Sequence, residues 1–293
     1  MSTTVAAAHG SRRWSGDWAR RERQRAVVDV LIPTSGRRTE LAATLSGLAA
    51  QDDPAFRVVI SDQSEDAAAR DDPVIQSLLR VLTVQGRAVD YLRHVQRRGI
   101  AENRQFLLEH ARADFVLFLD DDVWLEPGML ERLHDAIEEL GCGLVGCAVQ
   151  GLSHLDDERP EELRTFRPWD HRVQPERIRR GTEAFERWPL HNAANLVHLA
   201  AELHLPEGEW LPYHVAWIGG CTLYRTTALR DCGGFAFWSE LPPSHSGEDV
   251  AAQWKVMERY GGAGILPSGA VHLETPTTIP TRDVDAFDVL FPC

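Results

Sequence analysis

Three adjacent aspartates follow the most apolar segment of the chain, and they are its clearest candidates for chemistry. Asp120, Asp121 and Asp122 come directly after residues 115–119, whose sequence Phe-Val-Leu-Phe-Leu reads as a buried strand. Desolvation and mutual repulsion oppose the ionisation of clustered carboxylates unless a cation offsets their charge. Oxygen ligands favour magnesium or manganese, which leave coordination positions open for the phosphate oxygens of a substrate. The cluster therefore predicts a Mn2+ or Mg2+ site for a phosphorylated substrate, whereas a single aspartate would be explained as a helix cap.

The segments around this cluster alternate between short apolar runs and amphipathic stretches. Strands are predicted at residues 27–32, 56–60, 91–92, 115–119 and 144–149, with helices between them, the first of which Thr39 can cap. This alternation predicts an α/β fold with a mostly parallel central sheet and helices on both faces. Ligands bind such sheets at the carboxyl ends of the strands. Asp62 and the three aspartates both follow predicted strands, so the sequence places a ligand site at that edge.

The composition limits the classes of partner. The chain of 293 residues is 43% hydrophobic, enough for a full core, and has a formal net charge of −13. Such an acidic surface repels nucleic acid and anionic membranes, so neither is expected as a general partner. It also repels a phosphorylated substrate, which then needs local positive charge. Arginine must supply most of that charge, because Lys255 is the only lysine.

The sequence also bears on the expected compartment. It has no run of about 20 apolar residues and no apolar core of signal-peptide type. The five cysteines form no C-x-x-C pair. We therefore expect a cytoplasmic protein with reduced thiols and no integral membrane segment.

Motifs in the first half resemble those of family 2 glycosyltransferases, which have the GT-A fold, a Rossmann-like sheet with a smaller acceptor-side region. The matching motifs are Pro33-Thr34 after the first strand, Asp62 after the second strand, Arg104 in a glycine-led helix start, and Asp120-Asp121-Asp122 at the family's Asp-x-Asp metal motif. The chain departs from the family's Ala-Arg-Asn motif, with Asn103 in place of alanine and Gln105 in place of asparagine.

This resemblance implies roles for individual residues. The residues implied to bind the donor are Pro33, Thr34, Asp62, Arg104, Asp120 and Asp121, and Asp62 would lie beside the nucleotide base. Asp122 and Asp120 would hold the metal, completed by His272, which resembles a late histidine of related GT-A enzymes. A lone histidine is nevertheless more often structural or exposed than a ligand.

In the second half, Glu248 and Asp249 resemble the family's Glu-Asp pair at the start of a helix. In inverting members a carboxylate there takes the proton of the acceptor, a role typically worth about 100- to 10,000-fold in rate. The resemblance favours Asp249 over Glu248 as this base. The alternative is a plain helix cap, which would not exclude catalysis.

The expected protein is a metal-dependent glycosyltransferase that transfers a sugar from a nucleotide-diphosphate sugar to an acceptor hydroxyl. By resemblance the donor is UDP-linked and the reaction is inverting, while the acceptor is a glycan, a lipid-linked molecule or a small molecule. The expected organisation is a disordered Arg-rich tail at residues 1–25, a donor-binding half at 26–150, and an acceptor-binding half at 151–293 with an irregular insertion at 151–213.

Three other functions stay open. A sugar nucleotidyltransferase would need a basic, glycine-rich phosphate loop, which residues 33–38 match only faintly. A haloacid dehalogenase-type phosphatase would need threonine or valine four residues after Asp120, where Trp124 stands. A nucleotide-sugar-binding protein without turnover would not require a positioned base.

Overall fold

The computed structural model of the chain describes residues 25–65, 68–170, 172–191, 193–206, 208–277 and 282–292. The expected Arg-rich tail lies outside these residues except for Arg25. Within them, no helix combines the length and the apolar character needed to cross a membrane.

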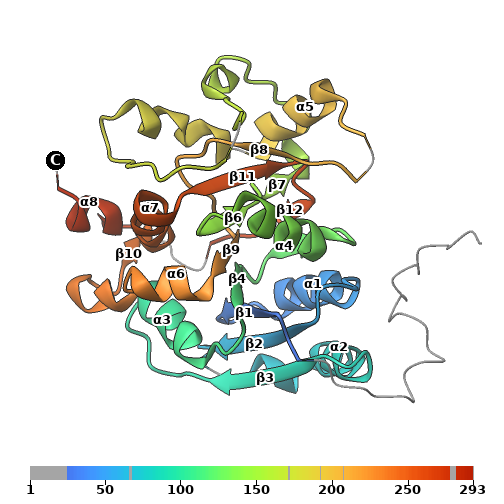
Figure 1. Cartoon of the computed structure of the whole chain (residues 1–293). Helices are drawn as coiled ribbons and strands as arrows, with labels where there is room; N and C mark the ends of the chain where they lie inside the picture. The colour runs from blue at the N-terminus through green and yellow to red at the C-terminus, as the bar shows by residue number, and fades with distance from the viewer. Residues whose placement is uncertain are drawn as a thin grey trace, which may run out of the picture.

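An eight-stranded sheet crosses the whole molecule (Figure 1). Its strands are β1 (Val28–Thr34), β2 (Phe56–Asp62), β3 (Ala88–Arg93), β4 (Phe115–Leu119), β6 (Leu144–Gly146), β8 (Leu211–Tyr213), β9 (Cys221–Arg225) and β11 (Gly262–Leu266). They lie in the order β3-β2-β1-β4-β9-β6-β11-β8. The first four are mutually parallel, and so are β6 and β11. β9 runs antiparallel to both of its neighbours, and β8 runs antiparallel to β11. The expected α/β fold with a large, mostly parallel sheet is confirmed.

Helices cover both faces of this sheet because successive strand residues point to opposite sides. In β1, for example, Val30 and Ile32 belong to one core and Leu31 to the other. The first core is closed by α1 (Arg38–Ala49), α2 (Pro73–Val84) and α4 (Met129–Leu140). The second is closed by α3 (Ile100–His110), α6 (Thr226–Asp231), α7 (Glu248–Tyr260) and α8 (Ala286–Leu290). Figure 1 shows α1, α2 and α4 at the right of the sheet and α3, α6 and α7 at the left.

The first helix does not begin as expected. α1 starts at Arg38, so Thr39 lies inside its first turn, and Arg37 occupies the cap position without capping through its side chain. The prediction of a Thr39 cap was therefore wrong. The Arg37 guanidinium instead reaches Asp121 and Asp122, which helps to fix the path of the chain into the helix.

Two small sheets bring distant segments to the edge of the large one. β5 (Val123–Leu125), β12 (Ala270–His272) and β7 (Gln150–Gly151) form one of them, and β10 (His245–Ser246) pairs with β13 (Val284–Asp285) in the other. In the first, His272 lies opposite Val123, the residue after Asp122. This pairing carries the late histidine to the aspartate cluster.

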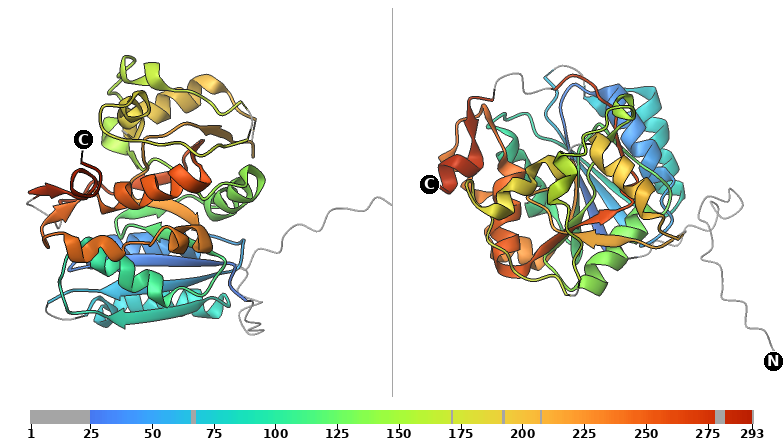
Figure 2. Two further views of the ribbon diagram at one scale, coloured as in Figure 1. Left: turned by 60° about the vertical axis from the view of Figure 1, so that its left-hand side comes forward. Right: turned by 90° about the horizontal axis from the view of Figure 1, so that it is seen from above.

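The segment between β7 and β8 is built from short helices. They are η3 (Leu152–His154), η4 (Glu162–Thr165), η5 (Glu183–His191) and the longer α5 (Ala193–Leu203). Two further short helices elsewhere in the chain are η2 (Ala69–Asp71) and η6 (Ala236–Glu240). Figures 1 and 2 show the segment between β7 and β8 at the top of the molecule, at the opposite end of the sheet from β3. Strands from residues 26–150 and strands from residues 151–293 lie in the same sheet, where β9 separates β4 from β6. The expected division into two halves at residue 150 therefore stays a prediction.

Candidate active site

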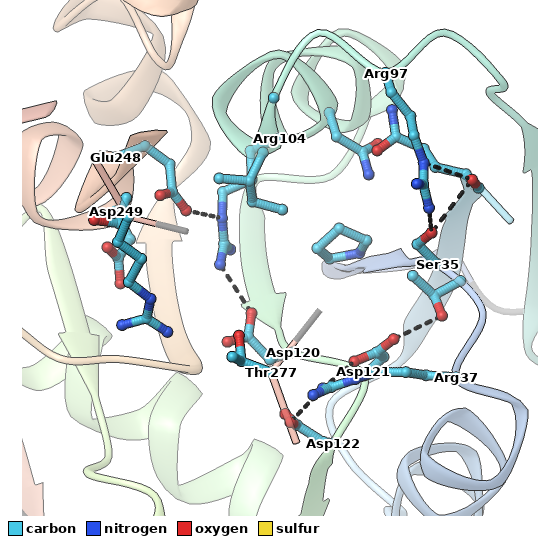
Figure 3. A pocket seen from close by; sticks show the side chains of 18 of the residues that line it. Ser35, Arg37, Arg97, Arg104, Asp120, Asp121, Asp122, Glu248, Asp249 and Thr277 are labelled. Carbon is cyan, nitrogen blue, oxygen red and sulfur yellow. Dashed lines mark hydrogen bonds and ion pairs between the residues drawn. The ribbon is translucent and has the colours of Figure 1, made fainter. Parts of the chain in front are cut away.

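A cleft of about 520 Å3 lies at the carboxyl ends of β1 and β4 and is closed on its far side by the start of α7 and by the segment after β12. Figure 3 shows the charged side chains that converge on it. The predicted site residues that line this cleft are Pro33, Thr34, Arg104, Asp120, Asp121, Asp122, Glu248, Asp249 and His272. The structure thus brings together segments that are more than 200 residues apart in the sequence.

Asp121 is the most deeply held of the three aspartates. Its carboxylate accepts a hydrogen bond of 2.7 Å from the Thr34 hydroxyl, and Arg37 Nη1 lies 3.2 Å away. Its backbone carbonyl accepts a hydrogen bond from Thr44 in α1. Burial raises the pKa of Asp121 to about 7, and the charges of the neighbouring aspartates add to this effect. Asp121 therefore joins the first strand, the first helix and the aspartate cluster.

Asp122 faces a cation and a histidine. Arg37 Nη1 lies 2.5 Å from its carboxylate, and His272 Nε2 lies 3.4 Å from the same oxygen. Burial opposes ionisation of Asp122, but the hydrogen bonds and charges of His272 and Arg37 outweigh it and hold its pKa below the usual range. The hydrogen bond to Asp122 in turn raises the pKa of His272. Arg37 also donates to the carbonyl of Pro276, so it links the aspartates to the segment after β12.

Arg104 connects the two acidic groups of the cleft. This buried guanidinium donates to Glu248 through Nε at 2.9 Å and to Asp120 through Nη2 at 2.8 Å. Burial alone would lower the pKa of Arg104, but the charges of Asp120, Glu248 and Asp249 raise it. Arg104 thus stays charged and neutralises one carboxylate from each end of the cleft (Figure 3).

Asp249 differs from the other acidic residues. Its Oδ1 accepts a hydrogen bond from the Val250 amide, and it forms no ion pair among the residues that the structure describes. Burial against surrounding protein raises the pKa of Asp249, and the negative charge of Glu248 raises it further. A carboxylate with a raised pKa and a free oxygen in a cleft is suited to accept a proton.

The donor groups at Asp122 and His272 fit a divalent ion in part. One carboxylate and one imidazole nitrogen stand within 3.4 Å of each other; the carboxylate suits manganese or magnesium, whereas imidazole is the more usual ligand of softer divalent ions. Asp120 is turned to Arg104 instead. In the part of the chain that is described, no three acidic, histidine or cysteine side chains converge to enclose an ion. Asp122 and His272 would therefore hold a metal only together with ligands other than the described acidic, histidine and cysteine side chains.

The structure places Asp62 behind the cleft. Its side chain is fully buried and is not among the residues that line the cavity. Its carboxylate accepts hydrogen bonds from the amides of Ser64 and Ala69 and pairs with Arg93 at 3.0 Å. Burial opposes its ionisation, but these hydrogen bonds and those from Ser64 and Tyr91 lower its pKa. The prediction that Asp62 contacts a nucleotide base is untested, and the hydrogen bonds and the ion pair that already occupy its carboxylate do not favour it.

Sequence reasoning missed several residues that line the cleft. Arg37, Arg97 and Asn103 lie in it, as do Thr275 and Thr277 after β12. The low lysine content was the available signal for the arginines, because it leaves arginine to meet a phosphorylated ligand. Asn103 stood out as a departure from the family motif, but its spacing alone did not show which way it faces.

The fold has similar solved structures. The chain matches TarS from S. aureus, a 1–349 fragment in complex with UDP-GlcNAc, with a TM-score of 0.53 and 17% identity over 86% of this chain and 60% of that one. It also matches the mannosyltransferase PcManGT from Pyrobaculum calidifontis, in complex with GDP-Man and Mn2+, with a TM-score of 0.50 and 16% identity over 85% of this chain and 61% of that one. These likenesses establish the fold as that of the GT-A glycosyltransferases.

Sequence comparison gives a second and independent result. A protein of Haemophilus influenzae described as an uncharacterized glycosyltransferase is 29% identical over 113 residues, which cover 39% of this chain and 35% of that protein. The chain therefore spans about a third of this relative. The model of glycosyl transferase family 2 matches residues 29–198, more than half of the chain. The chain belongs to glycosyl transferase family 2.

Proposed function

We propose that this protein is a nucleotide-sugar glycosyltransferase that inverts the donor's anomeric centre, with Asp249 as the general base. In this reaction the acceptor hydroxyl attacks the anomeric carbon of the donor, the bond from that carbon to the diphosphate breaks, and Asp249 takes the hydroxyl proton. The family and the fold support the reaction class. The arrangement of charges in the cleft supports the roles of individual residues.

The observation that carries the proposal is that, within the described part of the chain, four of the cleft's five carboxylates are ion-paired with arginine and the fifth is not. Arg104 pairs with Asp120 and Glu248, and Arg37 pairs with Asp121 and Asp122. Among the described residues Asp249 alone of the five has no ion pair, and its pKa is raised. It is therefore the one carboxylate of the five whose raised pKa is not opposed by an ion pair among the described residues.

A metal-bound diphosphate is the second part of the proposal. Asp122 and His272 supply two ligands, and phosphate oxygens of the donor would complete the set. A divalent ion held there offsets the charge that develops on the leaving diphosphate. Arg37 and Arg104 offset part of the negative charge of the cleft's carboxylates, which lowers the repulsion that an anionic substrate would meet in an overall acidic protein.

The donor is proposed to be UDP-linked, with GDP-linked sugars as the second candidate. UDP-GlcNAc and GDP-Man are the ligands named for the two similar structures. The acceptor is a hydroxyl compound that enters beside the start of α7, where Asp249 lies. A sugar nucleotidyltransferase or a phosphatase of the haloacid dehalogenase type is disfavoured by the family match.

Release of nucleoside diphosphate from UDP-GlcNAc and GDP-mannose tests this function. The wild-type protein should release UDP or GDP when Mn2+ is present and lose this activity when the metal is chelated. Asp249→Asn should slow release by about 100-fold or more while nucleotide affinity stays near wild type. Glu248→Gln is the matched control, because it removes the neighbouring carboxylate that Arg104 neutralises.

The outcomes separate the alternatives. If Glu248→Gln abolishes turnover and Asp249→Asn does not, the base is Glu248. If neither variant slows turnover, inversion by a base at this helix start is refuted. Tight binding without any turnover in the wild type would favour a binding protein.

A further inference from the structure

The last two residues of β2 have different surroundings. Asp62 is tied to the loop that follows it, as described above, and does not line the cleft. Ser61, which is also fully buried, donates its hydroxyl hydrogen to Oδ1 of Asn103 in α3. At this end of β2, Ser61 contacts the cleft-lining residue Asn103, whereas Asp62 faces away from the cleft.

Asn103 is a buried amide with a free donor. Its side chain lines the cleft although the residue is only 2% exposed. Oδ1 accepts from Ser61, whereas Nδ2 has no acceptor among the described residues. Nδ2 is not among the fully enclosed polar atoms of the described residues that lack a partner, so it is accessible from the cleft. An unpaired Nδ2 in a cleft marks a position where a ligand oxygen or nitrogen can bind.

The order of the strands places this amide relative to the aspartates. β2 is separated from β4 by β1 alone, and neighbouring strands lie about 4.8 Å apart. The end of β2 is therefore roughly 10 Å from the end of β4, where Asp120 begins the cluster. A nucleoside spans a similar length when it is measured from the carbonyl edge of the base to the 5′-phosphate. With the diphosphate near Asp122 and His272, the base falls at the end of β2, beside Asn103.

We propose that Asn103 reads the nucleobase of the donor. Its Nδ2 donates a hydrogen bond to a carbonyl oxygen on the edge of the base, and Ser61 fixes the amide in the orientation that presents Nδ2. Uracil and guanine carry such an oxygen, and adenine does not. This inference rests on the proposed function, since it assigns a specificity-determining residue within the same cleft.

Calorimetry with nucleoside diphosphates in the presence of Mn2+ tests the proposal. Wild type should bind UDP or GDP more tightly than ADP. Asn103→Ala should weaken binding of the preferred nucleotide by about 3- to 10-fold, the range of one hydrogen bond, and change ADP binding by less than twofold. Asn103→Asp should weaken it further, because its carboxylate repels a carbonyl oxygen. Ser61→Ala should reduce the preference over ADP to an intermediate degree.

Two controls separate base recognition from a general defect. Gln105→Ala removes another amide from α3, one that accepts from the Phe235 amide and does not line the cleft, and it should leave the base preference unchanged. Inorganic pyrophosphate should bind wild type and Asn103→Ala equally, because its contacts lie at the aspartate end.

Each result decides between the two proposals. If UDP or GDP binds wild type and Asn103→Ala keeps the full preference over ADP, the role of Asn103 is refuted and the proposed function stands. If wild type binds none of the three nucleotides, the proposed function fails and this inference fails with it. Loss of pyrophosphate binding in Asn103→Ala would show a structural role for Asn103 and would also refute base recognition.

Discussion

Two arginines determine which acidic residues of the cleft are neutralised. Arg104 lies between Asp120 and Glu248, and Arg37 lies against Asp121 and Asp122. Ion pairs of this kind hold carboxylates in place and favour their ionised form, although burial still raises the pKa of Asp121. Asp249 receives no such partner among the described residues, so its environment opposes ionisation. A group that is poorly stabilised as an anion is a better proton acceptor, at some cost in stability.

This cost gives a pH-dependent prediction for Asp249. Because its pKa is raised by folding, its favourable contribution to stability is present at low pH and is lost as the pH rises through the folded-state pKa. Asp249→Asn should therefore raise the melting temperature by a few degrees at pH 8 and by less at pH 5. For a chain of this size, a gain of about 1 kcal/mol in the free energy of unfolding raises the melting temperature by ~2–4 °C. Thermal unfolding across this range measures the effect. Glu139→Gln, an exposed carboxylate of α4, is the control and should show no such trend.

Wild-type turnover should follow the same group. Under the proposal that Asp249 is the base, its deprotonated form is the active one, so turnover should rise with pH from the acidic to the neutral range. A rate that is independent of pH between 5 and 8 would contradict the assignment of Asp249 as base.

Arg37 occupies the position from which a metal would contact Asp122. Its guanidinium carries a positive charge at 2.5 Å from that carboxylate, so a divalent ion must displace it or bind against its repulsion. Arg37→Gln should therefore bind Mn2+ about 10-fold more tightly in the absence of nucleotide, which is ~1.4 kcal/mol. Titration of free Mn2+ by electron paramagnetic resonance measures this affinity.

Arg38→Gln is the matched control for Arg37. It removes the same charge from an exposed neighbour that does not line the cleft. Equal Mn2+ affinities for wild type and Arg37→Gln would show that Arg37 and the metal do not compete.

For individual residues, the sequence predicted which acidic side chains line the cleft better than it predicted their ion-pair partners. Three aspartates after an apolar strand are unusual enough to be noticed, and they do line the cleft. The partner of each carboxylate depends on side-chain direction, which the spacing along the chain does not contain. Asp62 illustrates this limit, because the side chains of Ser61 and Asp62 point to opposite sides of β2, and only that of Ser61 contacts a residue that lines the cleft.

The starts of two helices meet beside the cleft, and His245 joins them. The ring is fully buried between α3 and the segment that leads into α7. Its Nε2 accepts from the Ala101 amide at 3.1 Å, and its Nδ1 lies 2.7 Å from the Pro242 carbonyl, which requires a neutral ring protonated at Nδ1. Gly99 makes room for it, since a Cβ there would lie 2.5 Å from the ring. This contact positions Arg104 relative to Glu248.

His245 should therefore matter for stability in a pH-dependent way. Burial lowers its pKa, so its contribution to stability is present above the unfolded-state value of 6.5 and is lost as the pH falls through the folded-state pKa. His245→Gln should lower the free energy of unfolding by about 1–3 kcal/mol at pH 8, because it leaves a buried backbone partner of the ring without a hydrogen bond. The variant should also lose less stability than wild type between pH 8 and pH 5.

Urea unfolding at the two pH values measures this difference. His154→Gln is the control, since His154 is exposed and lies outside this contact. If His245→Gln and wild type lose the same stability on acidification, protonation of His245 is not what destabilises the fold.

Element prediction succeeded where apolar periodicity was long enough to see. β1, β2 and β4 are fully buried runs of five to seven residues, and α7 begins at Glu248 as its pattern indicated. β5, β7 and β12 have only two or three residues each, too few to show a period. These short strands nevertheless decide that His272 reaches Asp122.

At the scale of the whole molecule, a partly buried ion cluster attaches the segment between β7 and β8 to the core. Glu176 accepts from Arg187, its carboxylate lies 3.6 Å from His214, and its amide donates to Met257 in α7. Trp169 stacks on His214 with 3.5 Å between ring centroids. Burial opposes ionisation of Glu176, but the nearby His214 and the hydrogen-bonded Arg187 lower its pKa to about 2.

Loss of this cluster should destabilise the whole protein. The contribution of Glu176 is present above its ordinary pKa of 4.5 and is lost as the pH falls toward about 2. Glu176→Gln should lower the free energy of unfolding by about 1.5–3 kcal/mol at pH 7, the range expected for charge-assisted hydrogen bonds. The loss should be clearly smaller at pH 3.5. Urea unfolding at both pH values measures the cost, with the exposed Glu158→Gln as control. An unchanged midpoint would mean that the segment is held by its apolar contacts alone.

The fold class was predictable from the whole sequence, but the strand order was not. Alternating strands and helices indicate a layered α/β protein, and the family motifs appear in the expected order. The insertion of β9 between β4 and β6 depends on contacts between segments about 100 residues apart, which no local pattern records. The second half therefore contributes to the same sheet in a way that only the structure reveals.

The position of β9 has a consequence for synthesis on the ribosome. β4 is the most apolar strand of the chain, and one of its edges is covered only by β9. Cys221 follows Leu119 by 102 residues, so at about 5–20 residues per second this edge waits roughly 5–20 s for its partner. An unpaired apolar edge invites pairing with other chains. We therefore expect nascent chains that end between these two strands to depend on chaperones, and this dependence should end once β9 has left the ribosomal tunnel.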